Sequence, residues 1–271
     1  MKRIVVAFAI LSLALWLFAC NNEEITPAKI DILKVGKADC IVIDTGSYLV
    51  MIDTAEEENL EKIHDYMEKN GYSKIDTLIL THFDKDHIGG AKDIILKYNV
   101  ERVIESSFSS GSQWYTGYHT LLESLGVSPI KLKSDYGFTY DSCNFEINVP
   151  RSDKYSTKES NNSSLVVSLK IGENKLLFCG DAMELRLKEL IAEDIGAYDF
   201  VKLPYHGNYL ENYREFLNMV KAKYGAITCS AKNPTDERVL ALCEEYGIDV
   251  FETRYGLISV TADIKEIKVS Q

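Results

Sequence analysis

Four side chains that could bind a metal ion lie within six residues: His82, Asp84, Asp86 and His87. They directly follow residues 77–81, a short run of apolar and branched side chains that predicts a buried strand. Ligand sites of layered α/β proteins commonly form at the carboxyl ends of such strands. Imidazole nitrogens and carboxylate oxygens are the ligands expected for zinc, manganese and iron. The pattern therefore predicts a metal site, against the alternative of a polar loop with two solvated histidines.

A similar arrangement recurs in the second half of the chain. Residues 175–179 predict another buried strand, which leads through Gly180 and Asp181 into a helical pattern over residues 183–192. Two such halves indicate an α/β fold of four layers, αββα, with the site where both sheets end. No linker-like stretch divides the chain after its first residues, so a single domain over residues 28–271 is expected. We also expect a loop over residues 106–117, a helix over 118–125 and a final strand over 257–260.

The first cluster resembles the signature of the metallo-β-lactamase superfamily, His-x-His-x-Asp-His, with Asp84 in place of the second histidine. With aspartate at this position, the cluster resembles that of one branch of the superfamily. This branch contains the hydrolase domain of ComEC, the bacterial DNA-uptake channel. The resemblance covers about residues 28–268. It implies the metallo-β-lactamase type of αββα sandwich and a metal-dependent hydrolase.

The resemblance also implies roles for residues outside the first cluster. Gly180-Asp181 looks like the Gly-Asp motif, whose carboxylate bridges two metal ions, and His206 beside Gly207 occupies a ligand position. Tyr205 stands where this branch has its first histidine. The implied ligands are Asp86, His87 and His206 with bridging Asp181 for one ion, and His82 and Asp84 for the other.

Asp53 and the segment Asn161-Asn162-Ser163-Ser164 could support the site. Asp53 matches the first acidic motif of the superfamily, which usually lies beside the metals, although capping the next helix explains it nearly as well. The remaining ligand histidine of the superfamily has no counterpart, and residues 161–164 occupy that region. Asn161 and Ser164 could complete a metal shell, hold water or form a turn before the next strand.

The implied ligands determine the expected chemistry. A bound metal lowers the pKa of water toward ~7, which provides hydroxide near neutral pH, and polarises the bond that is cut. Asp86 could receive the proton as a general base. Asp84 supplies a negative charge and a hard oxygen where a neutral histidine is usual, which weakens the Lewis acidity of its metal and suits manganese. We expect one or two zinc ions, with manganese as the alternative.

The amino terminus has the pattern of a secretion signal. Two basic residues precede an apolar run over residues 4–19, which is shorter than the ~20 residues of a membrane span. The run ends at Leu17-Phe18-Ala19-Cys20, which resembles the lipobox of bacterial lipoproteins. We therefore expect a signal peptide over residues 1–19, a lipidated Cys20 with a tether over 20–27, and an extracytoplasmic domain anchored to the membrane. An uncleaved anchor is the alternative, and it also leaves the domain outside the cytoplasm.

The expected mature chain is strongly acidic. The full chain has 30 basic and 41 acidic side chains, and loss of Lys2 and Arg3 with residues 1–19 changes the net charge from −11 to −13. This charge opposes long-range attraction to nucleic acid, so no extended nucleic-acid surface is expected. A metal can still focus a local positive field. A small or single-stranded phosphodiester could therefore bind through the metals, with Lys85 assisting.

The cysteines do not predict a disulfide framework. Six occur in the chain, and those after Cys20 are odd in number and have no CxxC spacing. Cys179 and Cys229 lie in apolar strand-like runs, which is typical of buried, unreactive thiols.

Three functions fit these patterns. The first is a lipid-anchored, metal-dependent hydrolase that cleaves phosphodiesters. The second is a hydrolase of a lactone, a β-lactam or a thioester, since this fold hosts many unrelated hydrolases. The third is a non-catalytic binding lipoprotein that keeps the fold.

Overall fold

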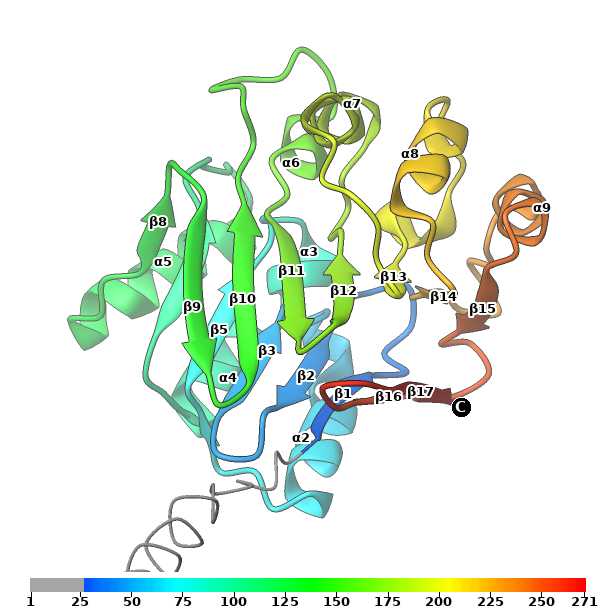
Figure 1. Ribbon diagram of the computed structural model, residues 1–271. Coiled ribbons are helices and arrows are strands. Elements are labelled where there is room, and N and C mark those ends of the chain that lie inside the picture. Colours follow the sequence, from blue (N-terminus) through cyan, green and yellow to red (C-terminus); the bar gives the residue numbers. More distant parts are fainter. Residues whose placement is uncertain (1–26) are drawn as a thin grey trace, which may run out of the picture.

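Two facing β-sheets with helices on their outer sides make up residues 27–271, the part of the chain that the computed structural model describes (Figure 1). The first sheet has eight strands in the order β17-β16-β1-β2-β3-β5-β7-β8. Its strands are β1 (Ala28–Ile32), β2 (Ile41–Asp44), β3 (Leu49–Ile52), β5 (Thr77–Leu80), β7 (Val103–Ser106), β8 (Ile130–Leu132), β16 (Ile258–Ala262) and β17 (Ile267–Ser270).

The second sheet has seven strands in the order β15-β14-β13-β12-β11-β10-β9. Its strands are β9 (Tyr136–Tyr140), β10 (Cys143–Asn148), β11 (Val166–Ile171), β12 (Asn174–Phe178), β13 (Phe200–Lys202), β14 (Tyr224–Ile227) and β15 (Asp249–Glu252). A small separate sheet pairs β4 (Lys74–Ile75) with β6 (Asn99–Val100).

The helical segments are, in chain order, η1 (Glu57–Asn59), α2 (Leu60–Lys69), α3 (Lys85–Ile88), α4 (Ala91–Lys97), α5 (Gln113–Leu125), α6 (Glu159–Asn162), α7 (Glu184–Glu193), η2 (Pro204–Gly207), α8 (Tyr213–Val220) and α9 (Glu237–Glu245). None of these helices within residues 27–271 has the length and apolar character required to cross a membrane.

Along the central strands of each sheet both faces are buried, because apolar residues occupy successive positions there. In β5, Ile79 belongs to the core between the two sheets, whereas Leu78 and Leu80 pack in a second cluster with side chains of α2, α4 and α5. In β12, Phe178 faces the core between the sheets, and Leu177 packs with α7, α8 and α9. Each such buried side chain contributes about 1.5–3 kcal/mol. The four-layer αββα sandwich predicted from the sequence is confirmed.

Each sheet contains a block of parallel strands. In the first sheet β3, β5, β7 and β8 run parallel, and in the second β12, β13, β14 and β15 do so. The register pairs Leu78 of β5 with Met51 of β3, and Leu177 of β12 with Val201 of β13. The loops after β5, β12 and β13 therefore leave the sheets at the carboxyl ends of neighbouring parallel strands.

Two expected element boundaries are wrong. Helix α5 begins at Gln113 and not at residue 118, because Ser112 caps it by accepting a hydrogen bond from the Tyr115 backbone N–H at 3.2 Å. The strand over residues 257–260 is not the last one, since β17 follows and pairs antiparallel with β16. Side chains of β17 alternate between half-buried and exposed, and a polar edge strand gives little sequence signal.

The cysteines agree with the sequence expectation. Cys40, Cys143, Cys179, Cys229 and Cys243 are all buried and free. Burial raises the pKa of Cys179 to about 12, which keeps its thiol protonated and unreactive near neutral pH. Cys20, the predicted lipidation site, and the predicted signal peptide lie outside the described residues.

Candidate metal centre

The loops after β5, β12 and β13 bring together side chains from both halves of the chain. His82 and Asp84 lie between β5 and α3, and Asp86 and His87 lie in α3. Asp181 follows β12, and His206 lies in η2 shortly after β13. Both sheets therefore contribute to one site at the carboxyl ends of their parallel strands, as the sequence predicted.

Four of the predicted ligands form a compact group. Asp86, His87, Asp181 and His206 each offer an atom, and these atoms lie within 4.8 Å of one another. The Asp181 carboxylate lies between the two imidazoles, with Oδ1 3.4 Å from His87 Nε2 and Oδ2 3.2 Å from His206 Nε2. Asp86 Oδ2 is 3.3 Å from the same His206 nitrogen. Asp86 is 23% exposed and is the open side of an otherwise buried group.

The other two predicted ligands border this group. His82 is fully buried, and its Nε2 lies 3.7 Å from Oδ2 of Asp84, whose side chain is 39% exposed. The rings of His82 and His87 are 4.1 Å apart between centroids. Asn161 Nδ2 lies 3.3 Å from Asp84 Oδ2 and 3.4 Å from Asp181 Oδ2. The amide that replaces the missing superfamily histidine is thus in contact with carboxylates from both halves of the site.

Asp53 and two hydroxyl groups orient the first two histidines. Asp53 Oδ2 accepts hydrogen bonds from His87 Nδ1 at 2.7 Å and from Thr81 Oγ1 at 2.7 Å. Because the Thr81 hydroxyl donates to Asp53, its oxygen can only accept from His82 Nδ1, which is 3.1 Å away. Ser164 Oγ lies 3.4 Å from the same nitrogen and donates to the Asn161 carbonyl. Protons on both Nδ1 atoms leave both Nε2 atoms as acceptors or ligands.

A second buried network orients His206. Its Nδ1 lies 2.9 Å from Thr228 Oγ1 and 3.0 Å from the Thr228 carbonyl. The Thr228 hydroxyl in turn donates to Asp39 Oδ1 at 2.6 Å. Lys202, which is fully buried, forms an ion pair with Asp39. Burial raises and the Lys202 ammonium lowers the pKa of Asp39, and the net shift is downward, so this carboxylate is ionised near neutral pH.

Sequence reasoning did not assign roles to Asp39, Lys202 or Thr228. Asp39 ends the turn Gly36-Lys37-Ala38-Asp39, and Lys202 stands at the end of the apolar segment of β13. A lysine in a buried strand needs a partner, and this was the available signal.

The donor set fits a divalent metal ion. The Nε2 atoms of His82, His87 and His206 and Oδ1 of Asp181 are buried, and none has a hydrogen-bond partner among residues 27–271. Leaving such a group unsatisfied costs about 1–3 kcal/mol. A metal ion within the compact group would satisfy the atoms of His87, Asp181 and His206, and His82 would need an ion at its border. Two or three imidazoles with carboxylates are suited to zinc, and the share of oxygen ligands also suits manganese.

The cluster is strongly negative in the absence of an ion. Burial lowers the pKa of His87, but the Asp181 and Asp53 carboxylates raise it to well above its usual value. Burial likewise lowers and Asp181 raises the pKa of His206, with a net rise. The carboxylates therefore attract positive charge to the place where these imidazoles meet, as a cation site requires.

Several residues of the site have left-handed backbone conformations. Asp53, Tyr205 and His206 have φ values of 58°, 50° and 52°. Such conformations cost of order 1–3 kcal/mol each and are concentrated at functional sites. At Gly180, with φ +52°, an added Cβ would lie 3.1 Å from Thr81, so the residue before Asp181 must be small.

The structure gives Lys85 and Tyr205 different surroundings. Lys85 Nζ lies 2.6 Å from Glu58 and 3.8 Å from Glu56, so two carboxylates already neutralise it. The Tyr205 ring lies 5.6 Å from the Nζ of Lys37, which forms no ion pair with a carboxylate in the described part of the chain. Lys37 is therefore a cation beside Tyr205 that no carboxylate of the described residues neutralises.

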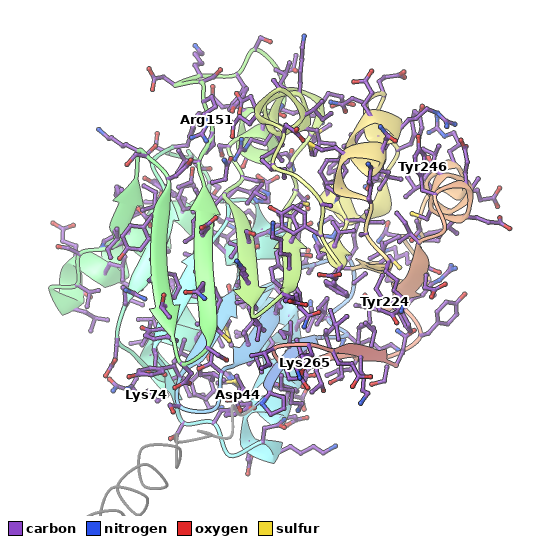
Figure 2. The ribbon with its side chains drawn as sticks, in the orientation of Figure 1. Asp44, Lys74, Arg151, Tyr224, Tyr246 and Lys265 are labelled. Atoms are coloured by element: carbon purple, nitrogen blue, oxygen red, sulfur yellow. The ribbon has the colours of Figure 1, made fainter. Side chains whose placement is uncertain are left out.

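Two exposed cations elsewhere on the molecule are also paired. Figure 2 labels Lys74 and Arg151 at different places on the surface. Lys74 bridges Asp76 and Glu101 at 2.8 Å each, and Arg151 bonds both Asp135 and Glu193.

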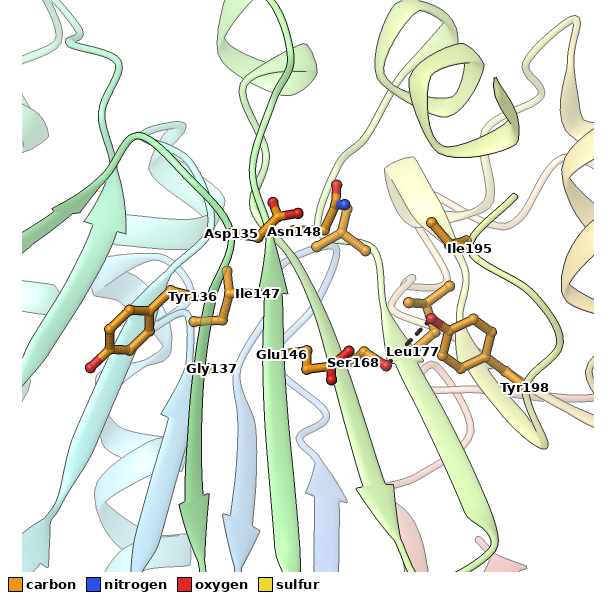
Figure 3. A pocket seen from close by; sticks show the side chains of 11 residues that line it. Asp135, Tyr136, Gly137, Glu146, Ile147, Asn148, Ser168, Leu177, Ile195 and Tyr198 are labelled. Carbon is orange, nitrogen blue, oxygen red and sulfur yellow. Dashed lines mark hydrogen bonds between the residues drawn. The ribbon is translucent and has the colours of Figure 1, made fainter. Parts of the chain in front are cut away.

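A separate cavity of about 380 Å³ lies on the helix-covered side of the second sheet, away from the cluster (Figure 3). Ser168 Oγ donates a hydrogen bond of 3.3 Å to the Tyr198 hydroxyl across it. It is lined by Asp135, Tyr136, Gly137, Glu146, Ile147, Asn148, Val166, Ser168, Leu177, Ile195 and Tyr198. None of the predicted ligands and no histidine lines it, so the metal chemistry does not involve this cavity.

Two facing sheets between helices, with a buried His/Asp cluster at the ends of their parallel strands, define a metal-site protein of the αββα class. Residues 33–136 match the sequence model of the family described as Metallo-beta-lactamase superfamily. Over these residues the chain is similar to this superfamily, and it is distantly homologous to two curated proteins, ComE operon protein 3 and Recombination protein 2.

These relatives are much longer than the present chain. ComE operon protein 3 from Bacillus subtilis is 26% identical over 266 residues, which cover 88% of this chain and 33% of that protein. Recombination protein 2 from Haemophilus influenzae is 28% identical over 204 residues, which cover 75% of this chain and 23% of that protein. The chain thus spans about a third or less of the relatives' length.

Among solved structures, the metallo-beta-lactamase fold protein YhfI from Bacillus subtilis superposes with a TM-score of 0.59 at 11% identity. The superposition covers 90% of this chain and 100% of that one. At this identity the likeness concerns the fold.

Proposed function

We propose that this protein is a metal-dependent hydrolase that cleaves phosphodiesters outside the cytoplasm, where a lipid on Cys20 holds it at the membrane. The observation that carries the proposal is the set of buried histidine Nε2 atoms without partners, grouped around the Asp181 carboxylate. Each imidazole is fixed through its Nδ1, so the free nitrogens are oriented in advance for an ion.

The residues that would hold the ion come from both halves of the chain. Asp86, His87, Asp181 and His206 form the compact group, and His82 and Asp84 border it. A divalent cation bound there supplies an activated water and polarises the bond that is cut.

Asp86 is the residue best placed to handle the proton. Burial raises its pKa, but the neighbouring imidazoles of His206 and His87 lower it more, so the net shift is downward and Asp86 is ionised near neutral pH. Its partial exposure gives solvent and substrate access to the carboxylate. An ionised carboxylate at the open side of the cluster can accept the proton of an attacking water.

Two observations support a phosphodiester as the substrate. The arrangement of ligands resembles the ComEC branch, and a curated relative bears the name Recombination protein 2, which points to nucleic-acid chemistry. The expected mature charge of −13, from the full-chain value of −11 without Lys2 and Arg3, argues against many phosphate contacts. We therefore infer that the substrate is small or single-stranded and is bound through one or two phosphates.

The decisive experiment compares substrate classes on the purified domain loaded with zinc or manganese. We expect hydrolysis of bis(4-nitrophenyl) phosphate and of short single-stranded oligonucleotides, and negligible turnover of a β-lactam or a lactone. Raising the salt concentration from 50 to 200 mM should raise KM less than about tenfold, because at most two phosphates are contacted. Efficient β-lactam or lactone hydrolysis with no phosphodiester cleavage would refute the proposal.

Matched variants link the activity to the cluster. Asp181→Asn keeps the shape of the side chain and removes its charge, so it should abolish metal-dependent turnover. His119→Gln is the control, because His119 is 23% exposed and contacts Glu105 rather than the cluster. If His119→Gln loses activity while Asp181→Asn keeps it, the reaction takes place outside the cluster.

The location is tested separately. Labelled fatty acid should enter the wild-type protein, and Cys20→Ala should prevent this and release the domain from the membrane. If the wild-type protein never incorporates the label, lipidation is ruled out and an uncleaved amino-terminal anchor remains the explanation for membrane attachment.

A further inference from the structure

Lys202 and Asp39 form an ion pair beneath the cluster, and both side chains are almost completely buried. Lys202 belongs to β13 of the second sheet, whereas Asp39 lies in the loop before β2 of the first sheet. Removing two charges from water is costly, and an apolar pair of similar volume is often as stable or more stable. Stability alone therefore does not explain why the pair is present.

The lysine side of the pair contacts the segment that carries Asp181. Lys202 Nζ donates a hydrogen bond of 3.1 Å to the carbonyl oxygen of Gly180. Gly180 has a left-handed backbone and directly precedes Asp181. Fixing this carbonyl fixes the peptide from which the Asp181 carboxylate projects toward the two imidazoles.

The aspartate side of the pair reaches two other predicted ligands. Asp39 Oδ1 accepts the hydroxyl proton of Thr228 at 2.6 Å, so the Thr228 oxygen is left to accept from His206 Nδ1 at 2.9 Å. The Asp39 backbone N–H donates to the carbonyl of Asp86 at 3.1 Å. The ionised carboxylate cannot donate, so it sets the direction in which the Thr228 hydroxyl points its proton.

We propose that the Asp39–Lys202 pair is a positioning device that sets the orientation of His206 through Thr228, and the orientation of Asp181 through Gly180. The pair connects the two sheets at the point where their ligands must meet. This inference rests on the metal site of the proposed function, but it does not depend on which substrate is cleaved.

The test separates positioning from stability with apolar replacements. Asp39→Leu and Lys202→Met, made singly, should each lower the melting temperature of the metal-free protein, because each leaves one buried charge without its partner. The double variant Asp39→Leu/Lys202→Met removes both charges and should recover most of the melting temperature. Its affinity for zinc and for manganese, measured by calorimetry, should remain 10- to 100-fold weaker than that of the wild type.

Two controls make the result specific. Glu105→Leu/Lys131→Met removes another buried carboxylate with its lysine, 3.3 Å apart and away from the cluster, and should leave metal affinity unchanged. At position 228, Thr228→Ser keeps the hydroxyl and should bind metal like the wild type, whereas Thr228→Val should not.

If the double variant recovers metal affinity together with stability, the pair is only structural and the proposal is overturned. Wild-type affinity in a folded Lys202→Met protein would overturn it as well. Because affinity is measured without turnover, a protein that passes this test and cleaves no phosphodiester would refute only the proposed function.

Discussion

Replacement of Asp53 by asparagine tests most directly whether histidine orientation controls metal binding. Asp53 is fully buried and accepts three hydrogen bonds: from the Thr81 backbone N–H at 2.8 Å, the Thr81 hydroxyl at 2.7 Å and His87 Nδ1 at 2.7 Å. Asparagine has the same shape and tolerates the observed φ of 58°. In either orientation of the asparagine side chain, its NH₂ group points at a hydrogen-bond donor of Thr81 or His87.

The cost follows from the three hydrogen bonds. The least harmful orientation turns the NH₂ group toward the Thr81 N–H, which leaves that buried donor without an acceptor at a cost of about 1–3 kcal/mol. The two remaining bonds lose their charge assistance, at about 1 kcal/mol each. We therefore expect the free energy of unfolding to fall by about 3–5 kcal/mol. His87 is also held less firmly, so metal affinity should fall about 10- to 100-fold, which is about 1.4–2.7 kcal/mol of binding free energy.

Urea denaturation of the metal-free protein and calorimetric titration with zinc measure the two effects separately. Asp76→Asn is the matched control: Asp76 is also buried and accepts from the Leu49 N–H at 2.8 Å, but it contacts none of the predicted ligands. The control should lose stability and keep its metal affinity. If Asp53→Asn also keeps wild-type metal affinity, Asp53 is only a structural residue and the argument for a support beside the metals fails.

Three further predictions concern other parts of the molecule. Asp181→Ala should remove more metal and more activity than Asp84→Ala, because Asp181 is buried between two imidazoles while Asp84 is 39% exposed; equal metal contents by elemental analysis would contradict this. Burial raises the pKa of Glu105 above its unfolded value of ~4.3. Between these two pKa values the native state binds more protons than the unfolded chain. The free energy of unfolding therefore falls as pH rises through that window. Glu105→Gln should flatten this slope in urea denaturation from pH 4 to 8, and an unchanged slope would exclude Glu105 as its source. Lys37→Gln should raise KM for a phosphodiester several-fold, whereas Lys85→Gln, whose ammonium is already paired, should not; the reverse order in steady-state kinetics would restore Lys85 as the assisting cation.

The members of the cluster could be predicted because most of them directly follow a strand with a strong apolar pattern. His82 and His87 follow β5, and Asp181 follows β12, so each is placed at the carboxyl end of a parallel strand. That the two strands end near each other required the expected αββα arrangement of the two sheets. His206 lies in η2, which has no periodic pattern, and its role required the family resemblance in addition.

The residues behind the cluster could not be predicted from spacing. Asp39, Thr228 and Lys202 each lie beside or within a segment that is apolar for reasons of packing, and their meeting depends on how the two sheets face each other. Sequence periodicity shows which face of a strand is buried, but it does not show which residues of another sheet lie opposite. The edge strand β17 was missed because its pattern is mixed with polar residues.

The buried lysine also determines the electrical balance of the site. Five carboxylates surround the histidines: Asp39, Asp53, Asp84, Asp86 and Asp181. With neutral imidazoles their total charge is −5, of which the Lys202 ammonium cancels one unit. Two divalent cations would make the site neutral, whereas one would leave two negative charges that repel a phosphodiester anion. Because one positive charge is built permanently into the chain, two divalent cations would suffice for neutrality, and under the proposed function the filling of a second metal position would be the step that admits an anionic substrate.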